Sequence, residues 1–320
     1  MHAAVVTAFD TPPCYTTFAD PEPIEGELLV TVKAAGLHPI VRSLANGTHY
    51  GSTGELPFVI GVDGVGLLGD GQRTYFGVSR SPFGTFAERA LAASWMRIPL
   101  PDQLDDATAA GIANPAMSSW VALTARARFV AGESVLILGA TGTAGQLAVQ
   151  IARRMGARRV VAAGRNPRML ARLKELGADA VISLDQERDP LVSAFRKEVT
   201  GAGVDIVLDY IWGSPAECVL EAISQKGLRT AAPRVRYVQI GAMAGRSITL
   251  PASVLRSSGL ELLGSGFGSA SLDQIRIALT EFFKIAATQP FRFNVKTAPL
   301  SQIETLWNSP PEDARLVFQP

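Results

Sequence analysis

The sequence predicts an α/β protein with a β-rich domain and a doubly wound parallel sheet covered by helices. Short strand-like segments separated by glycine and proline fill the first third of the 320 residues. A regular alternation of strand and helix patterns begins near residue 134. A chain of this length is sufficient for two domains that each bury a core.

The β-rich part shows no convincing helical period before about residue 104. Strands are expected at residues 1–9, 27–37, 58–69 and 84–92. Helical spacing then covers residues 102–129, and we expect Asn114-Pro115 to separate two helices because proline lacks a backbone N–H.

The alternating part has apolar strands, which are typical of a parallel sheet buried on both faces. We expect strands at 134–138, 159–164, 180–184, 204–211, 235–242 and 260–266, and helices at 145–154, 167–176 and 273–286. The final segments FNVKTAPL and ARLVFQ resemble strands without crossover helices, so we expect them to return to the first domain. The predicted domains are residues 1–116, 117–258 and 259–320, and the third contains the last strand of the parallel sheet and the return.

Composition excludes several classes of function. The net charge of +1 gives no reason to expect nucleic acid or an anionic membrane as a partner. Two uncharged runs, 107–125 and 134–152, reach membrane-spanning length, but Asn114-Pro115 and the glycine turn make them poor spans. No secretory signal is visible, and two distant cysteines predict no disulfide framework, so we expect a cytoplasmic protein. Three histidines without metal-ligand spacing predict that no metal is bound.

The stretch VLILGATGTAGQLAVQIARRMGA, residues 135–157, indicates a strand, a glycine turn and a helix. Backbone N–H groups at such a helix start bind a pyrophosphate, assisted by the helix dipole. Gly142 would let the backbone approach the phosphates, and Gly145 would let the helix pack on the strand. The alternative is a strand–helix turn without a ligand. The predicted cofactor-binding residues are Ala140, Thr141, Gly142, Thr143 and Ala144.

The end of the next strand indicates which dinucleotide is bound. It contains Gly164, Arg165 and Asn166, and no Asp or Glu occurs from 157 to 174 to bind the ribose of NAD. A guanidinium at Arg165 suits a ribose 2′-phosphate, although a solvated surface arginine is the alternative. Together with the glycine turn, this favours NADP(H).

Several segments in order resemble the zinc-free quinone oxidoreductase branch of the medium-chain dehydrogenase/reductase superfamily. They are AAGLHPIVRSLANGTHYG, LPFVIGVDGVGLL, GTFAER, ANPAMSSWVAL, GESVLILGATGTAGQLAVQIAR, GADAVISL and VQIGAMAG. The glycine turn matches the A-x-x-G-x-x-G form of this family at Ala140, Gly142 and Gly145.

The resemblance implies a GroES-like β-rich catalytic domain and a Rossmann domain. It also implies a reaction, in which NADPH reduces a quinone or the C=C bond of an α,β-unsaturated carbonyl (an enone). The cysteine that zinc-dependent relatives carry soon after AAG is absent from Gly36-Leu37-His38. His38 and Val41 stand where zinc-free relatives usually have Asn and Asp, and Leu184 stands where a tyrosine is frequent.

The resemblance further places residues around the nicotinamide. Ser118 is expected to hydrogen-bond near the nicotinamide ribose, with a helix-surface serine as the alternative. The segments after two later strands are expected to present backbone groups to the nicotinamide. Simple strand-end turns are the alternative. Their residues are Gly241, Ala242, Met243, Gly266 and Phe267.

The predicted catalytic residues lie in the first domain. Reduction of an enone leaves negative charge on the carbonyl oxygen, which requires hydrogen-bond donors. His49 and Tyr50 are the candidate donors, and His38 is expected to orient substrate or cofactor. A structural role for each is the alternative, and water is an alternative source of the final proton.

Two alternative functions make different demands on the sequence. A short-chain dehydrogenase would need Tyr-x-x-x-Lys, which none of the five tyrosines provides. A non-catalytic NADPH-binding protein, structural or regulatory, stays as the alternative function. The expected partners are a small-molecule quinone or enone and a second copy of the chain in a homodimer, with no nucleic acid and no membrane.

Overall fold

The computed structural model describes residues 1–77, 79–224, 232–266, 268–309 and 314–320. The chain divides into two compact units. Unit 1 comprises Met1–Pro115 and Leu279–Pro320, and unit 2 comprises Ala116–Ala278.

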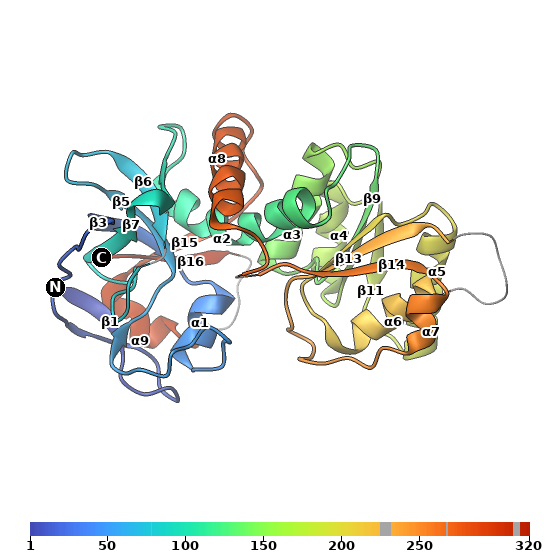
Figure 1. The fold of residues 1–320 in the computed structure, drawn as a ribbon, viewed down its shortest axis with the longest axis horizontal. Helices are drawn as coiled ribbons and strands as arrows, with labels where there is room; N and C mark the ends of the chain where they lie inside the picture. Colours follow the sequence, from blue (N-terminus) through green and yellow to red (C-terminus); the bar gives the residue numbers. More distant parts are fainter. Residues whose placement is uncertain (78, 225–231, 267, 310–313) are drawn as a thin grey trace. The chain divides into compact units, whose positions relative to one another are not determined.

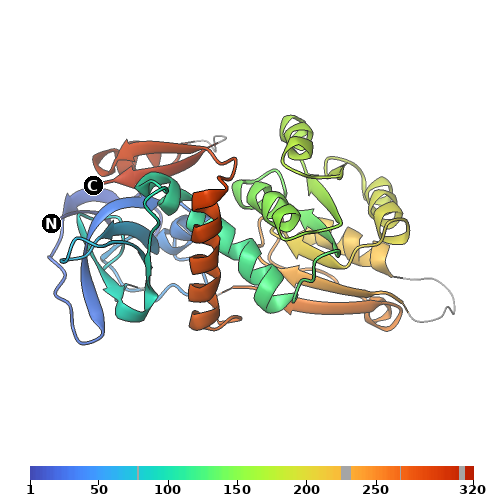
Figure 2. The same ribbon diagram turned by 90° about the horizontal axis from the view of Figure 1, so that it is seen from above.

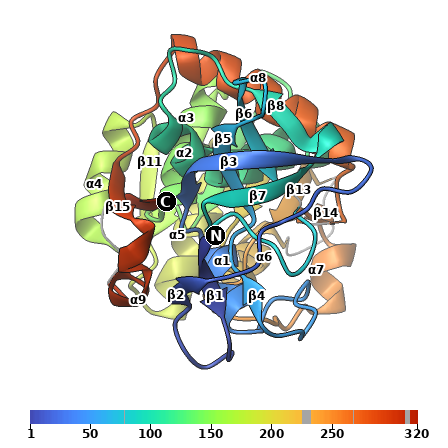
Figure 3. The same cartoon turned by 90° about the vertical axis from the view of Figure 1, so that its left-hand side faces the viewer.

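Unit 1 is rich in β-structure (Figure 3). Its strands are β1 (His2–Val6), β2 (Cys14–Thr17), β3 (Glu27–Gly36), β4 (Phe58–Val59), β5 (Asp63–Leu67), β6 (Arg73–Gly77), β7 (Arg89–Ala93), β8 (Arg97–Pro99), β15 (Val295–Pro299) and β16 (Arg315–Gln319). A three-stranded sheet has the order β2-β1-β4. A seven-stranded sheet has the order β15-β16-β3-β5-β6-β8, with β7 also paired to β3. The last two strands therefore return to the first part of the chain, as predicted.

Short helices in unit 1 correct two expectations. Helix α1 (Pro39–Ala45) lies where no helix was expected, because seven residues are too few to show a helical period. Proline at its first turn and the buried side chains Val41 and Ala45 stabilise it locally. The return segment is also not free of helices, because η3 (Leu300–Gln302) and α9 (Ile303–Leu306) connect the parallel strands β15 and β16. The 3-10 helix η1 (Ser94–Met96) precedes β8.

The expected helix break at Asn114-Pro115 is wrong. Helix α2 (Asp106–Val121) continues through Pro115 and is followed by the π-helical turn η2 (Ala122–Arg126). A proline inside a helix costs about 3 kcal/mol. Burial of the preceding small side chains Ala110 and Ala113 favours the continuous helix in spite of that cost.

Unit 2 is a six-stranded parallel sheet of order β11-β10-β9-β12-β13-β14, in which β14 forms one edge (orange in Figure 2). Its strands are β9 (Ser134–Leu138), β10 (Arg159–Gly164), β11 (Ala180–Ser183), β12 (Ile206–Asp209), β13 (Arg234–Gln239) and β14 (Gly259–Gly264). The helices are α3 (Thr143–Arg154), α4 (Pro167–Glu175), α5 (Arg188–Thr200), α6 (Gly213–Ile223) and α7 (Ala252–Arg256), and α8 (Leu272–Thr288) follows β14. This order confirms the predicted doubly wound α/β sheet.

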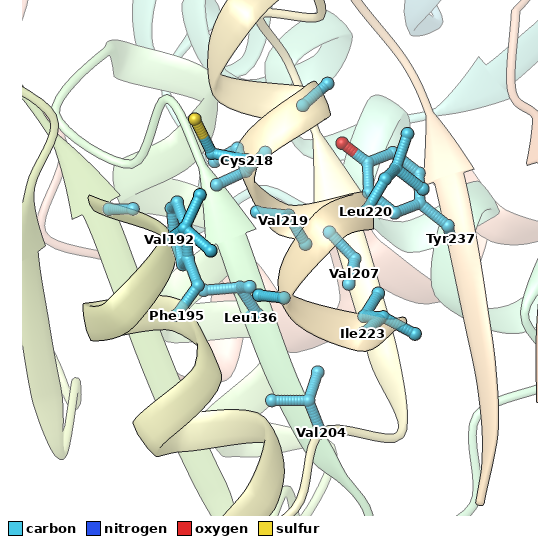
Figure 4. Close-up of a cluster of buried hydrophobic side chains, with 14 of the residues drawn as sticks. Leu136, Val192, Phe195, Val204, Val207, Cys218, Val219, Leu220, Ile223 and Tyr237 are labelled. Atoms are coloured by element: carbon cyan, nitrogen blue, oxygen red, sulfur yellow. The ribbon is translucent and has the colours of Figure 1, made fainter. Parts of the chain in front are cut away.

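The sheet of unit 2 is covered on both faces, with α3 and α4 on the side opposite α5 and α6 (Figure 1). On the second side, apolar residues of α5 and α6 pack against alternate residues of the strands (Figure 4). Phe195 of α5 and Val219 of α6 have no exposed surface, and both belong to the same cluster as Leu136 and Val207. This core fixes the strands whose carboxyl ends carry the candidate site.

Candidate functional site

The carboxyl ends of β9 and β12 define the place where a ligand is expected in unit 2. The chain proceeds from β9 to β10 on one side and reaches β12 on the other side, so the strand order reverses between β9 and β12. Open parallel sheets bind ligands in the crevice outside the strand ends at such a reversal. The segments that follow β9, β10, β12, β13 and β14 meet at this edge.

The glycine turn after β9 is held by backbone contacts on both sides. The N–H groups of Gly139 and Ala140 donate to the carbonyl of Ala163 on β10 over 3.0 and 2.9 Å, and that of Gly142 donates to the carbonyl of Gly139 over 3.1 Å. A Cβ atom on Gly145 would lie 2.4 Å from the carbonyl oxygen of Gly139, so only glycine permits this approach of α3 to the turn.

Helix α3 begins with an exposed start. Its N-cap is Gly142, and in the described part of the chain no side chain caps it. The first turn of a helix has backbone N–H groups without intrahelical partners, and the helix dipole adds attraction for an anion. Thr143 and Ala144, both half-buried, provide such groups next to Gly142. The residues present therefore fit a pyrophosphate.

The end of β10 lies directly beside this turn. A Cβ atom on Gly164 would be 2.4 Å from Cγ2 of Thr141, so the structure brings these two predicted residues into contact. Arg165 is exposed, and its guanidinium has no ion-pair partner among the described residues. Asn166 caps α4, because its Oδ1 accepts the N–H of Met169 over 3.1 Å.

A buried carboxylate organises the turn after β12, and sequence reasoning missed it. Oδ1 of Asp209 accepts the N–H groups of Ile211 and Trp212 over 2.8 and 2.9 Å, and Oδ2 accepts the hydroxyl of Tyr237 over 2.7 Å. Burial raises the pKa of Asp209, although these hydrogen bonds oppose the rise. Trp212 has φ +56° and ψ −156°, a region used almost only by glycine, so the anchored turn holds strained backbone.

Tyr210 links this turn to other predicted cofactor residues. The hydroxyl of Ser118 donates to that of Tyr210 over 3.3 Å, and burial raises the pKa of Tyr210 to about 12. A Cβ atom on Gly241 would lie 2.4 Å from the carbonyl oxygen of Tyr210. The structure thus brings Ser118 and Gly241 to Tyr210, which no sequence motif had indicated.

The remaining predicted cofactor residues follow β13 and β14. Ala242 and Met243 lie in the loop after β13, and Met243 is 78 % exposed. The N–H of Gly266 donates to Oγ of Ser269 over 2.7 Å within a local turn. Phe267 lies outside the described residues.

The predicted catalytic residues His49 and Tyr50 lie together in unit 1, in the turn after α1. Their ring centroids are 4.2 Å apart, and Tyr50 is 73 % exposed. The N–H of Gly51 donates to Nδ1 of His49 over 3.0 Å, and burial lowers the pKa of His49.

His38 differs from these two residues because its side chain is fully buried. Its Nε2 lies 3.4 Å from Oδ1 of Asp63, whose Oδ2 accepts the hydroxyl of Tyr75 over 2.7 Å. Burial lowers the pKa of His38, and the Asp63 carboxylate offsets only part of that effect. A neutral, buried His38 therefore belongs to a polar cluster within unit 1.

The described ranges contain no group of three or more His, Cys, Asp or Glu side chains arranged to hold a metal ion. No helix in this part of the chain is both long and apolar enough to cross a membrane.

A doubly wound parallel sheet of this kind is typical of dinucleotide-binding domains, and comparisons with known proteins identify oxidoreductases as relatives of the chain. The zinc-binding dehydrogenase family matches residues 144–284. The chain is 31 % identical over 240 residues to a quinone oxidoreductase of Lama guanicoe, covering 71 % of each protein. It is 29 % identical over 362 residues to a probable NADPH-dependent quinone reductase of Emericella nidulans, covering 100 % of both.

A solved structure shows the same fold over the whole chain. The quinone oxidoreductase from Thermus thermophilus, described also in complex with NADPH, has a TM-score of 0.81 and 26 % identity, covering 100 % of both chains. The chain belongs to the quinone oxidoreductase branch of the medium-chain dehydrogenase/reductase superfamily, with its GroES-like and Rossmann organisation.

The two glycines of the turn provide a matched test of the packing. Gly145→Ala is expected to lower the free energy of unfolding by about 1–3 kcal/mol, because its Cβ would overlap the Gly139 carbonyl. Gly142→Ala should change it by less than about 0.5 kcal/mol, because the nearest atom to its Cβ would be 3.5 Å away. Urea unfolding measures both, and equal losses would contradict the close approach at Gly145.

Proposed function

We propose that this protein is an NADPH-dependent oxidoreductase that reduces a quinone or the C=C bond of an α,β-unsaturated carbonyl without a metal ion. The observation that carries the proposal is the uncapped start of α3 at the strand reversal, beside the exposed Arg165. Membership of the quinone oxidoreductase family and the NADPH-dependent relative support it.

The cofactor is proposed to lie along the carboxyl edge of the parallel sheet. The N–H groups of Thr143 and Ala144 would hold the pyrophosphate, and Gly142 would allow its close approach. Ala140 and Thr141 would form the wall beside it. Gly164, Arg165 and Asn166 would surround the adenosine ribose, where the Arg165 guanidinium pairs with a 2′-phosphate.

The nicotinamide end is proposed to contact the other side of the strand reversal. Reduced nicotinamide supplies a hydride when it is bound. Ser118, held by Tyr210, would orient the ribose, and backbone groups of the later loops would contact the ring. These loop residues are Gly241, Ala242, Met243, Gly266 and Phe267.

The acceptor is proposed to meet His49 and Tyr50. Negative charge that develops on a carbonyl oxygen is stabilised by preorganised hydrogen-bond donors. His38 is fully buried, so its proposed contribution is to position the chain between β3 and α1 rather than to touch the substrate. The proton that completes the reduction would come from water.

A homodimer is proposed, with contact along β14. This strand pairs with β13 and forms an edge of the sheet, and edges of this kind favour pairing with another chain. Leu262 on β14 is 41 % exposed and Leu255 on α7 is 50 % exposed. Sedimentation equilibrium should give twice the chain mass of 33.9 kDa, and Leu262→Lys should shift the protein toward monomer. A monomeric wild-type protein would contradict the proposal.

Turnover with a panel of quinones and enones tests the proposed activity. NADPH oxidation should depend on the acceptor, and a chelator should leave the rate unchanged because the three histidines and two cysteines lack ligand spacing. A rate that a chelator abolishes and zinc restores would contradict metal-free chemistry. NADPH binding without turnover on any acceptor would favour the non-catalytic alternative.

Cofactor choice is tested at Arg165. Arg165→Ala should raise the Kd for NADPH roughly 10- to 150-fold, because a hydrogen bond to a charged group contributes about 1.5–3 kcal/mol. The Kd for NADH should barely change. The exposed Arg97 on β8 provides a control, and Arg97→Ala should leave both constants unchanged. An equal rise in Kd for both cofactors would show that Arg165 does not bind the 2′-phosphate.

A further inference from the structure

Unit 2 contains a charged groove that the proposed cofactor site does not use. Its volume is about 290 Å³, and small-molecule sites begin at roughly 300 Å³, so it can hold a small ligand. The η2 helix and the turn after it form one side, and β13 and β14 form the other. The charged residues that line it are Arg126, Arg128, Arg234 and Glu261. None of them is among the residues proposed to hold NADPH.

One side of the groove is held in place by the buried Arg236 on β13. Its Nη1 donates to the carbonyls of Ala127 and Arg128 over 2.6 and 3.4 Å, and its Nη2 donates to Oε1 of Glu133. Glu261 is the register partner of Arg236 on β14, so both lie on the same face of the sheet. The segment that carries Arg128 is therefore fixed against the face that carries Glu261.

The groove has more positive than negative charge. Arg234 donates from Nε and Nη2 to the two carboxylate oxygens of Glu261 over 2.6 and 2.8 Å, so these two charges offset each other. Arg126 donates from Nε to the carbonyl of Gly264 over 2.7 Å, which positions the side chain without neutralising it. Arg128 is exposed, and its guanidinium has no hydrogen-bond or ion-pair partner among the described residues. Within this part of the chain, two guanidinium groups of the groove therefore lack a carboxylate.

The backbone of Arg128 is unusual for an arginine. Its φ of +51° lies in the left-handed region, which glycine adopts readily and other residues adopt seldom. Local backbone energy thus favours glycine at this position and does not explain the arginine. Residues held in such conformations are enriched at ligand-binding sites, and the guanidinium without a partner agrees with that role.

We propose that this groove binds the phosphate group of a small organic phosphate. One guanidinium can occupy both oxygens of a carboxylate, whereas the three terminal oxygens of a phosphate monoester can accept hydrogen bonds from two guanidinium groups. The Nη groups of Arg126 and the guanidinium of Arg128 provide these donors. The half-buried side chains of Ala125 and Leu263 offer an apolar surface to the organic part of the ligand. This inference does not rest on the proposed function.

Proton–nitrogen NMR of the full chain, labelled in arginine and free of cofactor, tests the site. The Nε–H resonances of Arg126, Arg128 and Arg234 are identified from the spectra of single substitutions by lysine. Titration with inorganic phosphate or glycerol phosphate at constant ionic strength should shift all three resonances with one common Kd for each ligand. Glycerol phosphate should bind at least as tightly as inorganic phosphate, because it also covers the apolar surface. Acetate should produce no saturable shift.

Arg128→Gly removes the guanidinium and suits the backbone. Glycine adopts a φ of +51° without strain, so urea unfolding should show no loss of stability. The Kd for glycerol phosphate should rise roughly 10- to 150-fold, because charge-assisted hydrogen bonds are lost. Arg256→Ala is the matched control, since Arg256 is an exposed arginine of α7 that does not line the groove. This variant should keep the wild-type Kd.

Several results would overturn the proposal. They are shifts that sodium chloride reproduces, acetate binding as tight as that of the phosphates, weaker binding of glycerol phosphate than of inorganic phosphate, and an unchanged Kd in Arg128→Gly. The titration of Arg165→Ala separates this groove from the proposed cofactor site. The groove resonances should shift in this variant with the wild-type Kd, and loss of those shifts would show that phosphate binds at the cofactor site instead.

Discussion

The close packing of α3 on the end of β9 is the constraint on which the candidate site depends. Gly145 lies against the Gly139 carbonyl at a distance that no Cβ atom permits. This contact places the start of α3 beside the end of β10, where Gly164 leaves room for Thr141. The first N–H groups of the helix and the Arg165 guanidinium thereby come to one edge of the sheet. Our proposal places the pyrophosphate and the ribose 2′-phosphate of NADPH at this edge.

On the other side of the strand reversal, the turn after β12 depends on a buried carboxylate. Asp209 accepts three hydrogen bonds, and these offset the cost of burying its charge. In return the carboxylate holds Trp212 in a strained conformation and fixes the position of Tyr210, to which Ser118 donates. The two sides of the strand reversal therefore differ, because one consists of glycine backbone and the other of a hydrogen-bonded side-chain network.

Much of the fold follows from local patterns in the sequence. Strands β9 and β10 have the predicted bounds, because their apolar runs end at glycine turns. Helix α1 could not be predicted from seven residues, and the continuity of α2 through Pro115 depends on burial that the local sequence does not show. The glycine turn and Arg165 were evident as motifs.

The Asp209 network was not evident, because its partner Tyr237 is 28 residues away on another strand. The pairing of His38 with Asp63 depends in the same way on a contact between distant elements. The roles of the individual site residues stay predictions.

Hydrogen–deuterium exchange with and without NADPH tests the central claim, that the start of α3 at the strand reversal holds the cofactor pyrophosphate. Peptides covering residues 139–146 and 164–166 should exchange more slowly with NADPH, because the N–H groups of Thr143 and Ala144 would donate to phosphate oxygens and the bound cofactor would cover residues 164–166. A peptide covering residues 14–17 of β2 should be unchanged. NADPH that binds and leaves exchange over residues 139–146 unaltered would contradict the account.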